Sequence, residues 1–176
     1  MLNEAIIYAM EKHKKQRRKG TNLPYIVHPL AVMSILQQMG AGEELLCAGV
    51  LHDTLEDTDA TEEEIRKFGD RVYDLVKSHT DDKSLPWRER KEIALANVSK
   101  ADSEEQMLVL ADKLANIRDI ERDYKLLGDK LWTLFREPYE QQKWYYHGGV
   151  QALRKLYCEP MYQEFAMRVE NVFGIL

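Results

Sequence analysis

Hydrophobic residues recur at helical spacing along nearly the whole chain, and no stretch shows sustained alternation of apolar and polar positions. Polar loops, glycines and prolines separate the periodic segments. The predicted helices cover residues 2–14, 29–40, 42–54, 61–69, 70–79 and 86–98, a long segment from 103 onward, and two or three segments between 128 and 173. The pattern therefore predicts an all-α fold of roughly eight to ten helices.

Some of these helices carry additional signals in their sequence. Thr61 and Glu64, three residues apart, form a capping box, and Ser103 with Gln106 suggests another. The segment 42–54 is apolar on almost every side, so we expect this helix to run through the core. Prolines at 138 and 160 should separate the last helices.

Composition narrows the class of protein. The 176 residues suit one domain over 1–176, and 31% charged with 44% hydrophobic residues is typical of a soluble globular protein. The two cysteines have no paired spacing, and Cys47 lies in an apolar run, which indicates a buried thiol rather than a disulfide or zinc site. Glu4 and Glu11 in the first predicted helix argue against a secretory signal or a membrane span. We therefore expect a cytoplasmic protein.

Charge is distributed unevenly along the chain. The net charge is −5, yet residues 12–19, "KHKKQRRK", contain six Lys or Arg and no acid. Such a run can be a nucleic-acid patch, the wall of a pocket for an anionic ligand, or a solvated helix end. Confinement to one short segment argues against nucleic acid, because tracking a backbone needs basic residues on several elements.

Four ionisable residues directly follow the most apolar segment, in "HDTLED". If the helix continues past His52, the pairs His52 with Glu56 and Asp53 with Asp57 each share a helix face. Carboxylates in a dry site need a positive partner, which can be a metal ion or a basic side chain, or else water. Histidine with aspartate offers the mixed nitrogen and oxygen ligands that suit Mn²⁺, Fe²⁺, Zn²⁺ or Mg²⁺.

Further ligands must come from other helices, and two candidates are present. His28 precedes Pro29 at the expected start of the second helix, where it could also serve as a capping residue. Asp112 shares a helix face with Asn116 and Asp119. The alternative for Asp112 is a buried aspartate paired with an arginine. Together these residues indicate a metal site drawn from three helices.

These residues resemble a known family. His28, the pair His52-Asp53 and Asp112 are similar to the H…HD…D signature of HD-domain metal-dependent phosphohydrolases. The segments "RRKGTNLPYIVHP", "LHDTLEDTDAT", "TDDKSLPWRERK" and "LADKLANIRDI" resemble the hydrolase domain of RelA/SpoT proteins, and especially the stand-alone small alarmone hydrolases. The resemblance covers residues 3–120 and implies an HD-domain helical bundle. A chain of this length leaves no room for the synthetase domain of larger members.

The resemblance also implies roles for individual residues. One divalent ion, usually Mn²⁺ in this family, would be bound by His28, His52, Asp53 and Asp112. Two acids would orient or deprotonate the attacking water, and these are Glu56 and Asp57. The nucleotide pocket would be lined by Arg18 and Lys19, and Asn116 would lie near the ribose and phosphate.

The activity that the resemblance implies is hydrolysis of guanosine 3′,5′-bis(diphosphate) with release of the 3′-pyrophosphate. A metal ion favours such chemistry because it acidifies water and polarises a phosphoryl oxygen, and Glu56 is positioned to take the proton. Two alternatives remain: an HD phosphohydrolase for another nucleotide, such as a 5′-nucleotidase or an adenine-based alarmone hydrolase, and a nucleotide sensor without catalysis. Retention of Glu56 and Asp57 argues against the sensor. In every case the expected partner is a small-molecule nucleotide, not nucleic acid or a membrane.

Other histidines and aromatic residues receive no chemical role from the sequence. His13 and His79 have no obvious partners, so we expect them at the surface or at helix ends. The aromatic run Trp144, Tyr145 and Tyr146 is more typical of core packing than of a base-stacking platform.

Overall fold

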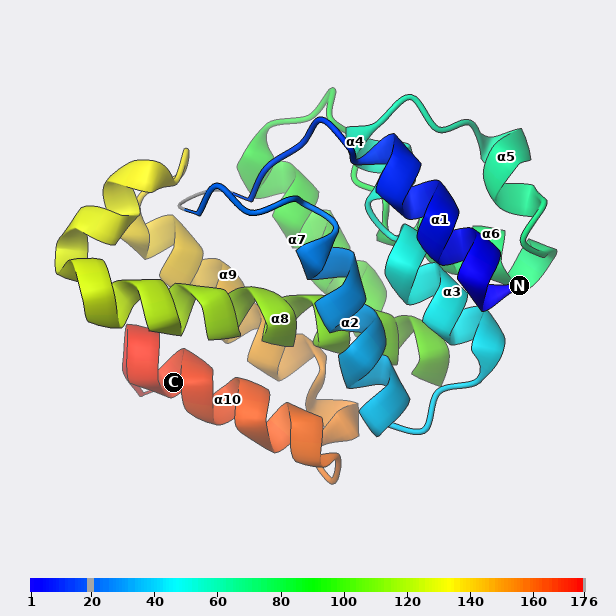
Figure 1. Cartoon of the computed structure of the whole chain (residues 1–176). Helices are drawn as coiled ribbons and strands as arrows, with labels where there is room; N and C mark the ends of the chain where they lie inside the picture. Colours follow the sequence, from blue (N-terminus) through cyan, green and yellow to red (C-terminus); the bar gives the residue numbers. More distant parts are fainter. Residues whose placement is uncertain (19–20, 176) are drawn as a thin grey trace.

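The structure, a computed structural model, describes residues 1–18 and 21–175 (Figure 1). Within these ranges the regular elements are ten α-helices and two 3-10 helices. Their bounds are α1 Leu2–Lys12, α2 Val27–Gln38, α3 Glu43–Leu51, α4 Thr54–Asp57, α5 Glu62–Arg66, α6 Asp70–His79, α7 Trp87–Val98, α8 Ser103–Leu127, η1 Gly128–Leu134, α9 Tyr139–Ala152, η2 Arg154–Leu156 and α10 Pro160–Phe173. The prediction of an all-α fold is therefore confirmed.

The long helix α8 is the centre of the bundle. It packs against α2, α3, α6, α7 and α10, and Figure 1 shows it crossing the molecule with α10 alongside and α2 running across it. At 1.5 Å per residue, its 25 residues span roughly 37 Å, enough to reach helices on several sides. Its apolar face is buried through Leu110, Leu114 and Ile117. Residues on its other faces can therefore enter sites formed with neighbouring helices.

Helix α3 runs through the core, as the sequence predicts. Residues 47–51 are all buried, and α1, α2, α6 and α8 surround the helix. Gly49 allows close approach to α2, because a Cβ there would lie 2.5 Å from a methyl group of Leu36. The predicted continuation of the helix past His52 is wrong. The chain turns at His52 and Asp53, and the short helix α4 begins at Thr54.

Two other helix starts differ from the prediction. Helix α2 begins at Val27, so Pro29 lies inside its first turn, where its missing N–H costs nothing. Helix α8 is capped by Asp102 and Glu105 rather than by Ser103 and Gln106. Asp102 accepts from the Glu105 N–H at 2.9 Å, and the Glu105 carboxylate accepts from the Asp102 N–H at 3.0 Å.

The capping box of Thr61 and Glu64 is confirmed. Helices α9 and α10 begin at Tyr139 and Pro160, as the prolines predict. None of the helices within the described ranges combines the length and the apolar character that a membrane crossing needs.

An ion-pair cluster joins α8 to α10 and gives a testable contribution to stability. Arg118 donates to both carboxylate oxygens of Glu164, at 2.8 and 2.7 Å, and Arg168 donates to the same carboxylate at 2.7 Å. These hydrogen bonds, chiefly those from Arg118, lower the pKa of Glu164 to about 2. The paired carboxylate therefore stabilises the folded state.

We expect Glu164→Gln to lower the free energy of unfolding at pH 7 by roughly 1 kcal/mol, because solvent partly screens this cluster. The folded pKa of Glu164 lies below the unfolded value. Its contribution is therefore fully present above about pH 4.3 and is lost as the pH falls towards 2. Urea unfolding at pH 7 and pH 3 measures both effects. Glu170→Gln, at an exposed position of the same helix, is the control. An equal loss of stability at both pH values would contradict the assignment.

Candidate active site

The four predicted metal ligands lie together, although they come from distant parts of the chain. His28 is in the first turn of α2, His52 and Asp53 form the turn after α3, and Asp112 is on α8. The Nε2 atom of His28 lies 3.1 Å from Oδ1 of Asp112 and 3.6 Å from Oδ2 of Asp53. The Nε2 atom of His52 lies 3.0 Å from Oδ2 of Asp53 and 3.7 Å from Oδ1 of Asp112. Two ligands about 2.1 Å from one ion, at right angles, are roughly 3.0 Å apart, so these spacings suit a single ion.

The surrounding hydrogen bonds hold these side chains in orientations suited to metal binding. Nδ1 of His52 donates to the Gly49 carbonyl at 2.8 Å, which leaves Nε2 free to act as a ligand. That Nε2 atom is buried and has no hydrogen-bond partner within the described residues. The hydroxyl of Tyr25 donates to Asp53 at 2.7 Å. A buried nitrogen directed at two carboxylates is what a metal-ligand set requires.

Electrostatics couples the four groups. Burial alone would raise the pKa of Asp53, but the nearby rings of His52 and His28 lower it below the usual range of an aspartate. Burial would also raise the pKa of Asp112, but the same two histidines lower it well below the usual value. Burial would lower the pKa of His52, but the two carboxylates raise it well above its usual value. The pair of partly buried carboxylates therefore strongly favours positive charge at this point.

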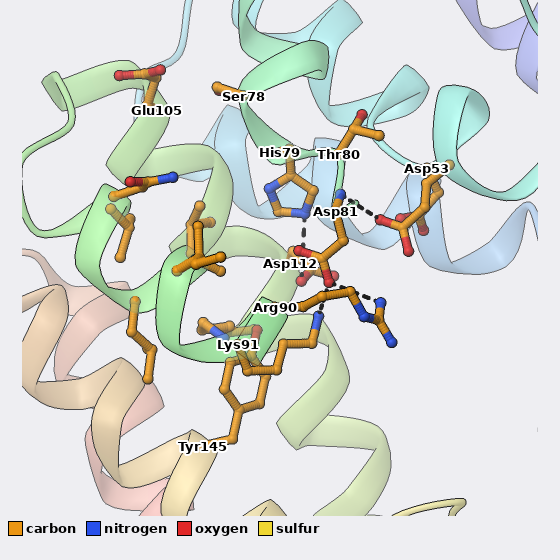
Figure 2. A pocket seen from close by; sticks show the side chains of 18 of the residues that line it. Asp53, Ser78, His79, Thr80, Asp81, Arg90, Lys91, Glu105, Asp112 and Tyr145 are labelled. Atoms are coloured by element: carbon orange, nitrogen blue, oxygen red, sulfur yellow. Dashed lines mark hydrogen bonds and ion pairs between the residues drawn. The ribbon is translucent and has the colours of Figure 1, made fainter. Parts of the chain in front are cut away.

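His79 also belongs to this cluster: it lies at a helix end, one of its two expected positions, and it is partly buried rather than at the surface. It is the last residue of α6, and its Nε2 lies 3.7 Å from Oδ2 of Asp112 (Figure 2). Its ring centroid is 5.2 Å from that of His52. Burial lowers the pKa of His79 to about 4, so the ring is neutral near pH 7. His52, His79 and Asp112 together form a second set of groups that could hold a metal ion.

His13 lies at the end of α1, one of the two positions expected for it, but it is buried and not at the surface. Its Nδ1 lies 2.6 Å from the side-chain oxygen of Gln16, and its ring packs against Tyr25. It therefore supports the residue that hydrogen-bonds Asp53.

The two candidate catalytic acids lie on α4, and each has a different environment. Glu56 lines the cavity that contains Asp53 and Asp112, and its Oε2 accepts from the backbone N–H of Asp81 at 3.1 Å. Burial raises the pKa of Glu56, which suits a general base near neutral pH. Asp57 instead accepts from Lys83 at 2.6 Å. The same Lys83 ammonium donates to the Glu56 carbonyl at 2.7 Å and fixes this short helix.

Two adjoining cavities surround the cluster. The larger, of about 630 Å³, contains His28, Asp53 and Asp112. The smaller, of about 360 Å³, has a wall of apolar and aromatic side chains, formed by Ile120, Leu131, Leu134, Phe135 and Tyr146. Three residues line both cavities, namely Arg18, Tyr25 and Asn116. Volumes in this range suit small-molecule ligands.

The structure describes two of the three predicted nucleotide-binding residues, Arg18 and Asn116. Arg18 donates to Asn116 at 2.8 Å and to Asp119 at 2.9 Å, and Asn116 donates to Asp112 at 2.7 Å. Arg18 and Asn116 thus connect the cavity junction to a candidate metal ligand. Lys19 lies outside the described residues.

The aromatic run of α9 divides between core and cavity. Tyr146 is buried and stacks on Phe173, as core packing predicts. Tyr145 lines the larger cavity.

A helical bundle that brings two histidines and two aspartates to one point beside a cavity defines a metal-dependent hydrolase. Residues 5–137 match the family described as "HD domain". The chain belongs to this HD-domain family.

Relatives and solved structures support this assignment. The chain is 44% identical over 126 residues to the guanosine-3′,5′-bis(diphosphate) 3′-pyrophosphohydrolase MESH1 of Xenopus tropicalis, covering 69% of this chain and 70% of that protein. The enzyme of the same description from Aquifex aeolicus is 38% identical over 68% of this chain, which corresponds to 18% of that longer protein.

The crystal structure of lmo0812 from Listeria monocytogenes EGD-e has a TM-score of 0.79 and 38% identity, covering 84% of this chain and 99% of that one. A metazoan ortholog of SpoT that hydrolyzes ppGpp has a TM-score of 0.75 and 32% identity, covering 98% and 93% of the two chains.

Proposed function

We propose that this protein hydrolyses guanosine 3′,5′-bis(diphosphate) and releases the 3′-pyrophosphate, using one divalent ion, Mn²⁺, held by His28, His52, Asp53 and Asp112. The observation that carries the proposal is the meeting of two histidines and two aspartates, with four His–Asp distances of 3.0 to 3.7 Å, beside two cavities. The name of the relative at 44% identity supports the substrate. We further propose that residues 1–176 act as one domain in the cytoplasm.

The chemistry divides between the ion and the chain. When bound, a divalent ion supplies an acidified water and a Lewis acid for the phosphoryl oxygen. Glu56 takes the proton from the water, because its burial raises its basicity and the Asp81 N–H holds its carboxylate at the cavity edge. Asp57, the second acid of the pair, is held by Lys83 and helps to orient this water. Of these two acids, only Glu56 is partly shielded from bulk water.

The two cavities suit the two ends of the substrate. The apolar wall of the smaller cavity suits the nucleoside, and Arg18 and Asn116 at the junction suit its ribose and phosphates. Lys19, next to Arg18 in sequence, remains a predicted contact to the phosphates. A free nucleotide is favoured over nucleic acid because much of the basic run is already paired. Lys12 pairs with Asp59 and Glu64, and Lys14 pairs with Glu11.

The decisive experiment is a comparison of substrates. Protein saturated with Mn²⁺ is incubated with guanosine 3′,5′-bis(diphosphate), with its adenine counterpart and with nucleoside 5′-monophosphates. Pyrophosphate and orthophosphate are measured separately. We expect pyrophosphate and guanosine diphosphate from the first substrate, and no product after removal of the metal by a chelator.

Three other outcomes would contradict the proposal. Orthophosphate from a monophosphate without turnover of the bis(diphosphate) would identify a 5′-nucleotidase. Faster hydrolysis of the adenine compound would show that the substrate contains adenine rather than guanine. Tight binding without turnover of any compound would identify a sensor.

A further inference from the structure

Three basic side chains converge on one wall of the larger cavity, and the proposed reaction gives them no role so far. Arg90 and Lys91 come from α7, and Lys113 comes from α8. Figure 2 shows Arg90 and Lys91 beside Asp81, close to Tyr145 and on the side of the cavity that Asp112 also lines. The cluster therefore lies within the same cavity as the candidate metal ligands.

Lys113 is the most unusual of the three. It is 4% exposed, and its ammonium has no hydrogen-bond partner within the described residues. Its Nζ lies 3.5 Å from the centre of the Tyr145 ring, a cation–π contact that uses the positive charge without satisfying its three N–H donors. A buried ammonium without an acceptor is costly. Its position on the cavity wall indicates that a ligand supplies the missing acceptor.

Arg90 and Lys91 have donors to spare as well. Asp81 accepts from Nη1 of Arg90 at 3.2 Å and from Nζ of Lys91 at 2.5 Å. Nε of Arg90 is buried without a partner within the described residues. One carboxylate thus accepts from two of the three basic side chains, and the surplus of donors favours an anion with several oxygens. A second metal ion would be repelled at this wall.

The geometry of α8 links this wall to the reaction centre. Asp112 and Lys113 are adjacent, so their side chains leave the helix about 100° apart. Asp112 faces the histidines, whereas Lys113 faces Tyr145 on α9, and both line the same cavity. A short anionic group that begins at the candidate metal ligands can therefore extend towards Lys113. A diphosphate, with one phosphate at each place, fits this arrangement.

We infer that Arg90, Lys91 and Lys113 form a subsite for the terminal phosphate of the 3′-diphosphate. This inference rests on the proposed function. In the reaction, the water oxygen bonds to the phosphorus next to the ribose, and the bond from that phosphorus to the ribose 3′-oxygen breaks. The 3′-oxygen takes up a proton, while Glu56 has accepted one from water. The subsite holds the far phosphate throughout and selects substrates with a diphosphate, rather than a monophosphate, at the 3′ position.

Lys113→Met tests the subsite, because methionine keeps the apolar part of the side chain and removes the charge. Arg90→Gln is a second variant at a less buried position. The binding of inorganic pyrophosphate to Mn²⁺-saturated protein is measured by calorimetry, in addition to kcat and KM. We expect each variant to bind pyrophosphate roughly 10- to 100-fold more weakly. We also expect the preference for a 3′-diphosphate over a 3′-monophosphate to fall by a similar factor, with Mn²⁺ affinity unchanged.

The controls are Lys125→Met, an exposed lysine on α8, and Arg88→Gln, which lies on α7 and pairs with Glu92 outside the cavity lining. Both should bind pyrophosphate like the wild type. Unchanged pyrophosphate binding in Lys113→Met and Arg90→Gln would overturn the subsite. Pyrophosphate binding needs no turnover. The wild-type protein could bind pyrophosphate through these residues and still fail to hydrolyse the bis(diphosphate). In that case the proposed function is wrong and the subsite is confirmed.

Discussion

Asp53→Ala is expected to abolish both divalent-ion binding and hydrolysis. The lost carboxylate oxygen lies 3.0 Å from Nε2 of His52 and 3.6 Å from Nε2 of His28, so it is central to the donor set. Changes to groups outside a metal's ligand set already cost 10- to 100-fold in affinity or activity, so loss of a ligand should cost more than about 100-fold. Calorimetric titration with Mn²⁺ and the electron paramagnetic resonance of bound Mn²⁺ measure the loss directly.

The stability of this variant gives an independent readout. A ligand that binds only the folded state raises the unfolding temperature. Mn²⁺ should therefore stabilise the wild type against heat and have no effect on Asp53→Ala. Asp74→Ala, which removes an exposed acid from α6, should behave like the wild type. An Asp53→Ala protein that bound Mn²⁺ with normal affinity would refute the ligand assignment.

The sequence predicted the helical architecture because local interactions determine most of it. Apolar spacing and the Thr61–Glu64 capping box depend on residues within one or two turns of each other. The turn at His52 and Asp53 was missed, because the apolar and polar pattern continues through it. The N-terminus of α8 was misplaced by one residue, since Asp102 and Glu105 form the same type of box as Ser103 and Gln106 would. Two possible capping boxes one residue apart are both consistent with the sequence, and only tertiary contacts decide which of them starts the helix.

The candidate metal ligands could be named from their motifs, but their neighbours could not. His79 meets Asp112 only because the end of α6 packs beside α8. A signal was nevertheless present, since His79 lies three residues after Val76 on the apolar face of its helix.

Lys113 offers a comparable signal. It lies three residues after Leu110 and four before Ile117, so a cation occupies an apolar stripe. A charged residue at a core position of a predicted helix therefore indicates a candidate functional residue, as a motif does.

Glu56→Gln separates proton transfer from metal binding. The substitution preserves the shape of the side chain and its acceptor for the Asp81 N–H, but it removes the base. We expect kcat to fall by roughly 10²- to 10⁴-fold, which is the usual contribution of a general base. Mn²⁺ affinity should be unchanged, because Glu56 is not among the four donor residues.

The pH dependence provides the sharper test of this role. A base works in its ionised form, and burial raises the pKa of Glu56 above its ordinary value. Wild-type activity should therefore be lost, as the pH falls, at a higher pH than an exposed glutamate would give, and Glu56→Gln should lack this inflection.

Stability supplies a further check on Glu56. A raised carboxyl pKa means that folding disfavours the charged form, so Glu56→Gln should not be destabilised at neutral pH. Glu63→Gln, at an exposed acid of α5 outside both cavities, is the control. A Glu56→Gln enzyme with normal kcat, or with the wild-type pH profile, would show that another group takes the proton.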